Sequence, residues 1–135
     1  MKKVQGVIFD VRCGVPYFLI FHRVLNWRGW EFLKETLEPG ETLLECLKRG
    51  IKEETHVKKY KIVRKLNKKH SWMWNGERVE IAQAYLVRMP MKQKINLKQK
   101  VIEHDEYKWA TKEEALKLLT HTNQRKILRS VRLFR

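Results

Sequence analysis

Residues 34–57 read KETLEPGETLLECLKRGIKEETHV, and this stretch decides the fold. It opens as a loop and turns sharply at Glu38-Pro39-Gly40, after which the apolar residues recur with the 3.6-residue period of a helix. Thr42, followed three positions later by Glu45, forms a capping box that marks the start of this helix. We expect the helix to run to about Thr55.

The charged residues of this helix suggest a metal site. Arg49 lies four positions from both Glu45 and Glu53, so it can pair with a carboxylate one turn to either side. The adjacent Glu53 and Glu54 diverge by about 100° around the helix axis, which suits two oxygen ligands that reach one metal from different directions. Hard oxygen ligands favour Mg²⁺ or Mn²⁺. Taken alone, these carboxylates are better explained by a solvated amphipathic helix.

The stretch as a whole resembles the Nudix box, Gly-x5-Glu-x7-Arg-Glu-U-x-Glu-Glu-x-Gly-U, in which U is aliphatic. Six residues match it at the right spacings: Glu41, Arg49, Ile51, Glu53, Glu54 and Val57. Three positions depart from it, because Glu35 and His56 stand where glycines are expected and Gly50 stands where the first glutamate of the helix is expected. The resemblance implies one α/β domain over residues 1–135, an αβα sandwich with a mixed β-sheet between helices.

The resemblance also implies a hydrolase that cleaves a pyrophosphate bond with the help of Mg²⁺ or Mn²⁺. Its catalytic residues would be Glu53, Glu54 and Arg49, of which the arginine orients the carboxylates. Glu53 and Glu54 would bind the metal, and Glu41 would support either the turn or the metal. Two such ions can neutralise a pyrophosphate and lower the pKa of a bound water.

Outside the box, the chain is most similar to the branch that contains the asymmetric diadenosine tetraphosphate hydrolases and the bacterial RNA pyrophosphohydrolases. Residues 103–109, EHDEYKW, resemble a Glu-His-x-x-Tyr-x-Trp run of that branch, which implies that Glu103 is a further metal ligand. The resemblance places Tyr85 where relatives stack an adenine and Lys34 where they contact a phosphate. Ile81 replaces a lysine that is frequent in these relatives, which weakens the assignment of a dinucleoside substrate.

Other aromatic residues offer a second substrate contact. His70, Trp72 and Trp74 alternate and would share one face of a strand. That face could form a wall for a nucleobase, with Trp72 as its main candidate, or simply pack as a half-buried strand.

Gly50 raises the question of whether the chain is an enzyme or a binding protein, and no feature of the sequence settles it. A glutamate there would lie one turn before Glu54 on the same face and add charge to the metal site. Its absence predicts weaker metal binding and motivates the alternative of a Nudix-like module that binds a nucleotide or RNA without turnover. We expect Gly50→Glu to strengthen metal binding and to stabilise the helix by a few tenths of a kcal/mol.

The remaining segments complete one domain. A hairpin is expected from residues 4–9 and 17–21, strands at 60–66, 79–87 and 106–109, and helices from Thr111 and over 123–133. This order indicates a mixed sheet with helices on both faces.

Composition limits the partners. At 135 residues, 43% of them hydrophobic and 33% charged, the chain is neither disordered nor a membrane protein, and with an N-terminus that resembles a strand we expect it to be cytoplasmic. The net charge of +15 favours polyanions, although a lysine-rich surface can also serve stability. We expect a nucleotide or dinucleotide substrate, with diadenosine tetraphosphate first and a triphosphorylated RNA end as the alternative. The sequence does not indicate an oligomeric state.

Overall fold

The computed structural model describes residues 1–133, which form one mixed sheet between helices. The elements in chain order are β1 (Lys2–Arg12), β2 (Val15–Arg23), β3 (Gly29–Glu31), β4 (Leu33–Thr36), α1 (Leu43–Thr55), β5 (Lys61–Leu66), β6 (Ser71–Trp74), β7 (Glu77–Arg88), β8 (His104–Thr111), α2 (Lys112–Leu118) and α3 (Thr122–Ser130).

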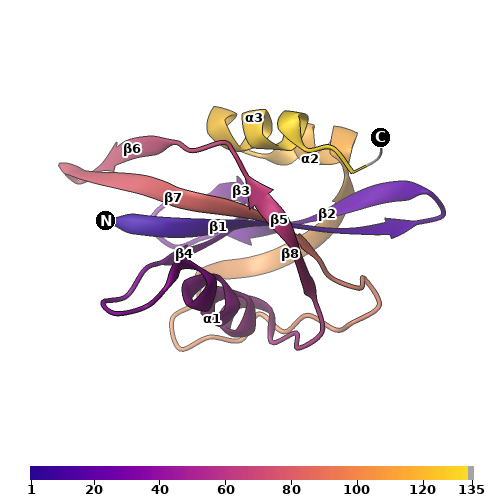
Figure 1. Cartoon of the computed structure of the whole chain (residues 1–135), viewed down its shortest axis with the longest axis horizontal. Helices are drawn as coiled ribbons and strands as arrows, with labels where there is room; N and C mark the ends of the chain where they lie inside the picture. Colours follow the sequence, from indigo (N-terminus) through magenta and orange to yellow (C-terminus); the bar gives the residue numbers. More distant parts are fainter. Residues whose placement is uncertain (134–135) are drawn as a thin grey trace.

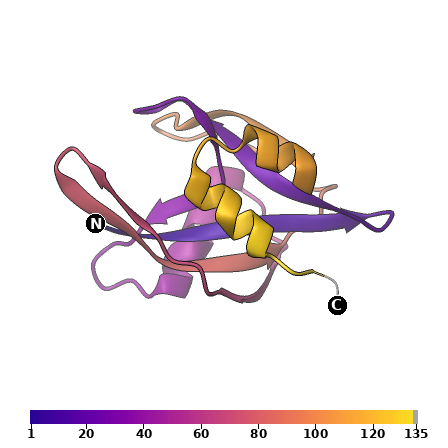
Figure 2. The same ribbon diagram turned by 90° about the horizontal axis from the view of Figure 1, so that it is seen from above.

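Strand β1 lies at the centre of the sheet. It pairs with β2 and β4 in antiparallel fashion and with β7 in parallel, which makes the sheet mixed. Strands β3 and β8 extend the sheet from β2, and β5 and β6 extend it from β7. Helix α1 covers one face, and α2 and α3 cover the other (Figures 1 and 2). The expected αβα sandwich is therefore confirmed.

The side chains of β1 point alternately to the two faces of the sheet and so enter two separate layers of the core. Val4 and Ile8 belong to a cluster on the α1 side, together with Leu47 of that helix. Val7 and Phe9 point the other way and pack in the cluster that α2 and α3 cover. Burial on both faces explains why the central strands read as nearly continuous apolar runs.

The helix starts agree with their sequence signals. Thr42 and Thr111 each cap a helix with the full reciprocal capping box. Helix α1 ends at Thr55 as expected, but α3 ends at Ser130 rather than at residue 133. The predicted end was wrong because Val131 takes an extended backbone, with φ −70° and ψ 128°, and is buried in the core. Among the described residues, no helix is long and apolar enough to cross a membrane.

Candidate active site

Arg49 fixes the turn that precedes α1. Its Nε donates to Glu41 Oε2 at 2.8 Å and its Nη2 donates to Glu41 Oε1 at 3.0 Å, a bidentate pair. The same Nη2 donates to the carbonyl of Thr36 at 2.7 Å and so ties strand β4 to the helix. The hydrogen bonds from Arg49 hold the pKa of Glu41 at about 2. Both oxygens of Glu41 are thus engaged, which favours its role in the turn over a role in metal binding.

Glu54 is the most unusual carboxylate of the chain. It is 1% exposed, and among the described residues neither of its oxygens has a hydrogen-bond partner. Burial raises its pKa well above the usual range, and the charges of Glu35 and Glu103 raise it further. Leaving a buried carboxylate without a partner is costly, so such a group is expected to meet a cation or a proton.

His104 connects Glu54 to a second buried carboxylate. Its Nε2 lies 2.8 Å from Glu31 Oε2, and its Nδ1 lies 3.4 Å from Glu54 Oε1. Since Glu31 accepts at Nε2, the Nδ1 of a neutral imidazole is an acceptor that faces the carboxylate of Glu54. Nδ1 of His104 and Oε1 of Glu54 are then two acceptors that repel each other, and a proton or a cation between them would remove the repulsion.

Glu31 is a buried charge that the sequence analysis missed. Burial opposes its ionisation, but the hydrogen bond from His104 and the charges of Lys34 and Arg23 outweigh burial and hold its pKa at about 2. Lys34 Nζ lies 3.0 Å from Oε1, and Arg23 Nη1 lies 3.1 Å from Oε2. The available signal was a single acidic residue between the large apolar residues Trp30 and Phe32.

Two of the predicted ligands line one cleft, and a third, Glu54, lies close to one of them. Glu53 and Glu103 line a cavity of about 500 Å³, together with Glu35, His56, Lys98, Gln99, Lys100 and Val101. One ligand atom from each of Glu54, Glu103 and His104 lies within 4.8 Å of the others. This set of carboxylates and one imidazole, with the unpartnered oxygens of Glu54 among them, fits a divalent ion such as Mg²⁺ or Mn²⁺.

The space at Gly50 is taken by Glu35. A Cβ atom added at Gly50 would lie 2.8 Å from Glu35 Cβ and 3.2 Å from Glu35 Cγ. The first distance is too short for a real contact and involves an atom close to the backbone. The expected stabilisation of the helix by Gly50→Glu is therefore wrong, since the new side chain would have to displace Glu35.

The predicted substrate residues fall into two groups. Lys34 and Trp72 line a cavity of about 380 Å³ with Trp27, His70, Met73, Trp74 and the first residues of α3, and Lys34 Nζ lies 4.9 Å from the centre of the Trp72 ring. Tyr85, by contrast, is 2% exposed and packs in the core on the α1 side. Its ring has no free face for a base, so the geometry does not favour the stacking role predicted for it.

A smaller cavity of about 170 Å³ adjoins the aromatic one. Lys34, Trp27, Trp72 and Trp74 line both cavities, and the smaller one adds Lys3, Arg23 and Asn26. The charges of Lys34 and Arg23, after burial, lower the pKa of Lys3, while Glu31 and Glu103 oppose this effect. Lys34 and Arg23 thus line the small cavity and at the same time pair with Glu31.

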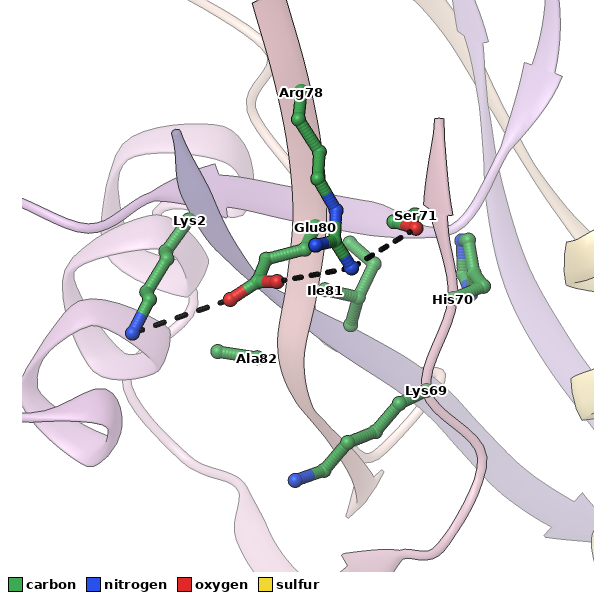
Figure 3. A pocket seen from close by; sticks show the side chains of 8 residues that line it. All are labelled: Lys2, Lys69, His70, Ser71, Arg78, Glu80, Ile81 and Ala82. Atoms are coloured by element: carbon green, nitrogen blue, oxygen red, sulfur yellow. Dashed lines mark hydrogen bonds and ion pairs between the residues drawn. The ribbon is translucent and has the colours of Figure 1, made fainter. Parts of the chain in front are cut away.

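A further cavity, of about 430 Å³, lies at the β6–β7 hairpin (Figure 3). Its carboxylate, Glu80, is paired with Lys2 at 4.0 Å and with Arg78 at 3.6 Å. Because that charge is already compensated, this cavity is a weaker candidate than the carboxylate cleft.

Comparison with known proteins identifies the fold family. The model of the NUDIX domain matches residues 4–131. No curated protein matches the chain by sequence. Among solved structures, the chain is similar to an Ap4A hydrolase of C. elegans in a binary complex, with a TM-score of 0.82, 22% identity, and coverage of 95% of this chain and 92% of that one.

Two other solved structures show the same fold. The dihydroneopterin triphosphate pyrophosphohydrolase of E. coli has a TM-score of 0.75 and 17% identity, with coverage of 94% of this chain and 91% of that one. The NUDIX domain of NrtR from Shewanella oneidensis, complexed with ADP ribose, has a TM-score of 0.72 and 14% identity, with coverage of 96% and 84%.

Proposed function

Because this chain belongs to the Nudix family, we propose that it is a metal-dependent hydrolase that cleaves a pyrophosphate bond in a nucleoside polyphosphate. The observation that carries the proposal is Glu54, a buried carboxylate whose two oxygens have no hydrogen-bond partner within residues 1–133 and which lies close to Glu103 and His104. A buried carboxylate without a partner has to be neutralised by a proton or a cation, and a divalent ion bound at Glu54, Glu103 and His104 would neutralise it.

The proposed roles of the residues are as follows. Glu53, Glu54 and Glu103 hold the divalent ion, which when bound neutralises phosphate charge and lowers the pKa of a water. Arg49 positions Glu53, since its Nη1 donates to Glu53 Oε2 at 3.4 Å, and Glu41 keeps Arg49 in place. His104 is held in place by Glu31 and would complete the metal site with its Nδ1, which lies 3.4 Å from Glu54 Oε1.

The substrate would extend from the aromatic cavity to the carboxylates. A base would stack in the cavity lined by Trp27, Trp72 and Trp74, because aromatic side chains bind every base through its π-face. The phosphates would follow Lys34, Lys3 and Arg23 toward the cleft. The likeness in fold to an Ap4A hydrolase supports a dinucleoside polyphosphate, with diadenosine tetraphosphate as the leading candidate.

A triphosphorylated RNA end is the second candidate. The net charge of +15 favours a long polyanion over a small nucleotide. Lys98 and Lys100 line the carboxylate cleft and could bind the phosphates of an RNA strand that enters from that side. Cleavage would occur at the same metal site, so the two candidates differ only in what binds beyond the reacting phosphates.

One experiment tests the proposal directly. The purified protein is incubated with Mg²⁺ or Mn²⁺ and diadenosine tetraphosphate, nucleoside triphosphates, ADP-ribose or triphosphorylated RNA, and the products are separated. We expect metal-dependent release of a nucleotide from at least one substrate, and its loss with Glu54→Gln. Tight nucleotide or RNA binding without turnover at any metal concentration would instead favour a binding module.

A further inference from the structure

We propose that Glu35 supplies the carboxylate that α1 lacks at Gly50. Relative to the Nudix box, the glutamate and the glycine have exchanged positions, so the metal site keeps its negative charge. This inference deepens the proposed function and rests on it. Residues 35 and 50 are both departures from the Nudix box, one a glutamate in place of a glycine and the other a glycine in place of a glutamate.

The two departures touch each other. Strand β4 carries Glu35 past the middle of α1, and its side chain occupies the space over Gly50 so closely that a Cβ there would lie 2.8 Å from its Cβ. A glycine at position 35 would open this space, and a glutamate at position 50 could then fill it. Only one of the two positions can carry a side chain in this backbone arrangement, and in this protein it is position 35.

The carboxylate of Glu35 faces the same cleft as the predicted ligands. It lines the cavity that Glu53 and Glu103 also line. The unpartnered oxygens of the buried Glu54 independently indicate a bound cation.

Arg49 holds Glu35 as it holds Glu53. Its Nη1 lies 3.3 Å from Glu35 Oε1 and 3.4 Å from Glu53 Oε2, so one nitrogen positions both carboxylates. The backbone amide of Thr36 also donates to Glu35 Oε1, at 3.0 Å. Within residues 1–133, Oε2 of Glu35 accepts no hydrogen bond, which leaves this oxygen for a metal or for a metal-bound water.

Glu35→Gln tests the assignment without changing the shape of the side chain. We expect the dissociation constant for Mn²⁺, measured from the electron paramagnetic resonance signal of the free ion, to rise by at least about 10-fold. Glu38→Gln is the matched control, since Glu38 lies in the turn after β4 with its Oε1 3.7 Å from Arg49 Nη1, but its side chain is 64% exposed. The control should bind Mn²⁺ as the wild type does. Glu54→Gln serves as the reference for loss of a ligand.

The exchange itself is tested by a double variant. Gly50→Glu alone should lower the melting temperature, because the new side chain collides with Glu35. Combining it with Glu35→Gly should restore the melting temperature above that of the single variant. It should also return the Mn²⁺ dissociation constant to within about 3-fold of the wild-type value, since the charge is moved and not lost.

The outcomes separate this inference from the proposed function. Wild-type Mn²⁺ affinity in Glu35→Gln, beside a loss in Glu54→Gln, would overturn the role of Glu35 and leave the hydrolase proposal intact. Mn²⁺ binding that depends on Glu35 in a protein without turnover on any nucleotide would support the ligand assignment and contradict the hydrolase. A wild type that binds no Mn²⁺ at millimolar concentration would overturn both.

Discussion

Replacing Glu54 by glutamine should make the metal-free protein more stable while it removes activity. The carboxyl is buried without a hydrogen-bond partner, and burial raises its pKa well above the ordinary value of 4.5. Glutamine has nearly the same shape and no charge. The variant therefore keeps the packing and removes the cost of protonating or desolvating the carboxylate on folding.

The size of the effect depends on pH in a defined direction. Because the folded state holds the proton of Glu54 more tightly than the unfolded state, its contribution to stability is fully present below pH 4.5 and is lost as the pH rises toward the folded-state pKa. The loss is about 1.4 kcal/mol per pH unit, or at most about 3.5 kcal/mol at pH 7. For a domain of this size, that difference corresponds to about 10 °C in melting temperature.

The assay is a series of thermal melts in chelator at pH 4.5 to 7. The difference between Glu54→Gln and the wild type should be small at pH 4.5 and grow toward pH 7, since contributions from other groups cancel in the comparison. Glu53→Gln is the matched control, because the Glu53 side chain is 52% exposed and should show no such growth. Saturating Mn²⁺ should then stabilise the wild type far more than Glu54→Gln, because only the wild type retains the complete site.

A constant difference across this pH range would refute the reasoning. It would mean that the carboxylate of Glu54 is ionised and compensated in the metal-free protein. His104 is the neighbour that could compensate it, by carrying a proton on Nδ1 at 3.4 Å from Glu54 Oε1. The site would then be a pre-formed ion pair and not an open position for a cation.

Three further predictions address turnover and substrate. Glu53→Gln should lower kcat by at least about 100-fold at saturating metal without unfolding the protein, and near wild-type activity would contradict its role as a ligand. Trp72→Ala should raise the KM for a nucleoside polyphosphate by about 5- to 150-fold with a smaller change in kcat, as loss of base stacking does; an unchanged KM would place the base elsewhere. RNA affinity, measured by fluorescence anisotropy, should fall steeply between 50 and 200 mM salt, and a flat response would assign the +15 charge to stability.

Local signals in the sequence were sufficient for the elements that build the site. The capping box at Thr42 and the apolar period placed α1 correctly from its first residue to Thr55. These signals act between neighbours along the chain, so no knowledge of the tertiary structure was needed. The β1–β2 hairpin and the layers of the sandwich followed from the same kind of pattern.

The contacts that define the site were not predictable in this way. Glu31 and His104 are far apart in the chain, and only the pairing of β2 with both β3 and β8 brings them to 2.8 Å. Tyr85 could not be distinguished from a base-binding residue, because strand alternation does not tell which face of a doubly covered sheet a ligand reaches. The contact between Glu35 and Gly50 likewise depends on how closely β4 approaches α1.

His56 is the third departure from the Nudix box, and its contact also depends on the tertiary structure. It ends α1 in the left-handed conformation, with φ 57°, which explains why the family pattern has a glycine there. A histidine in this conformation is strained, yet its Nε2 lies 2.8 Å from the carbonyl of Lys98. That contact ties the end of α1 to the segment that leads to Glu103, so the strained residue joins the two segments that carry the proposed ligands. Each departure thus has a contact of its own, because Glu35 occupies the space over Gly50 and His56 meets the carbonyl of Lys98.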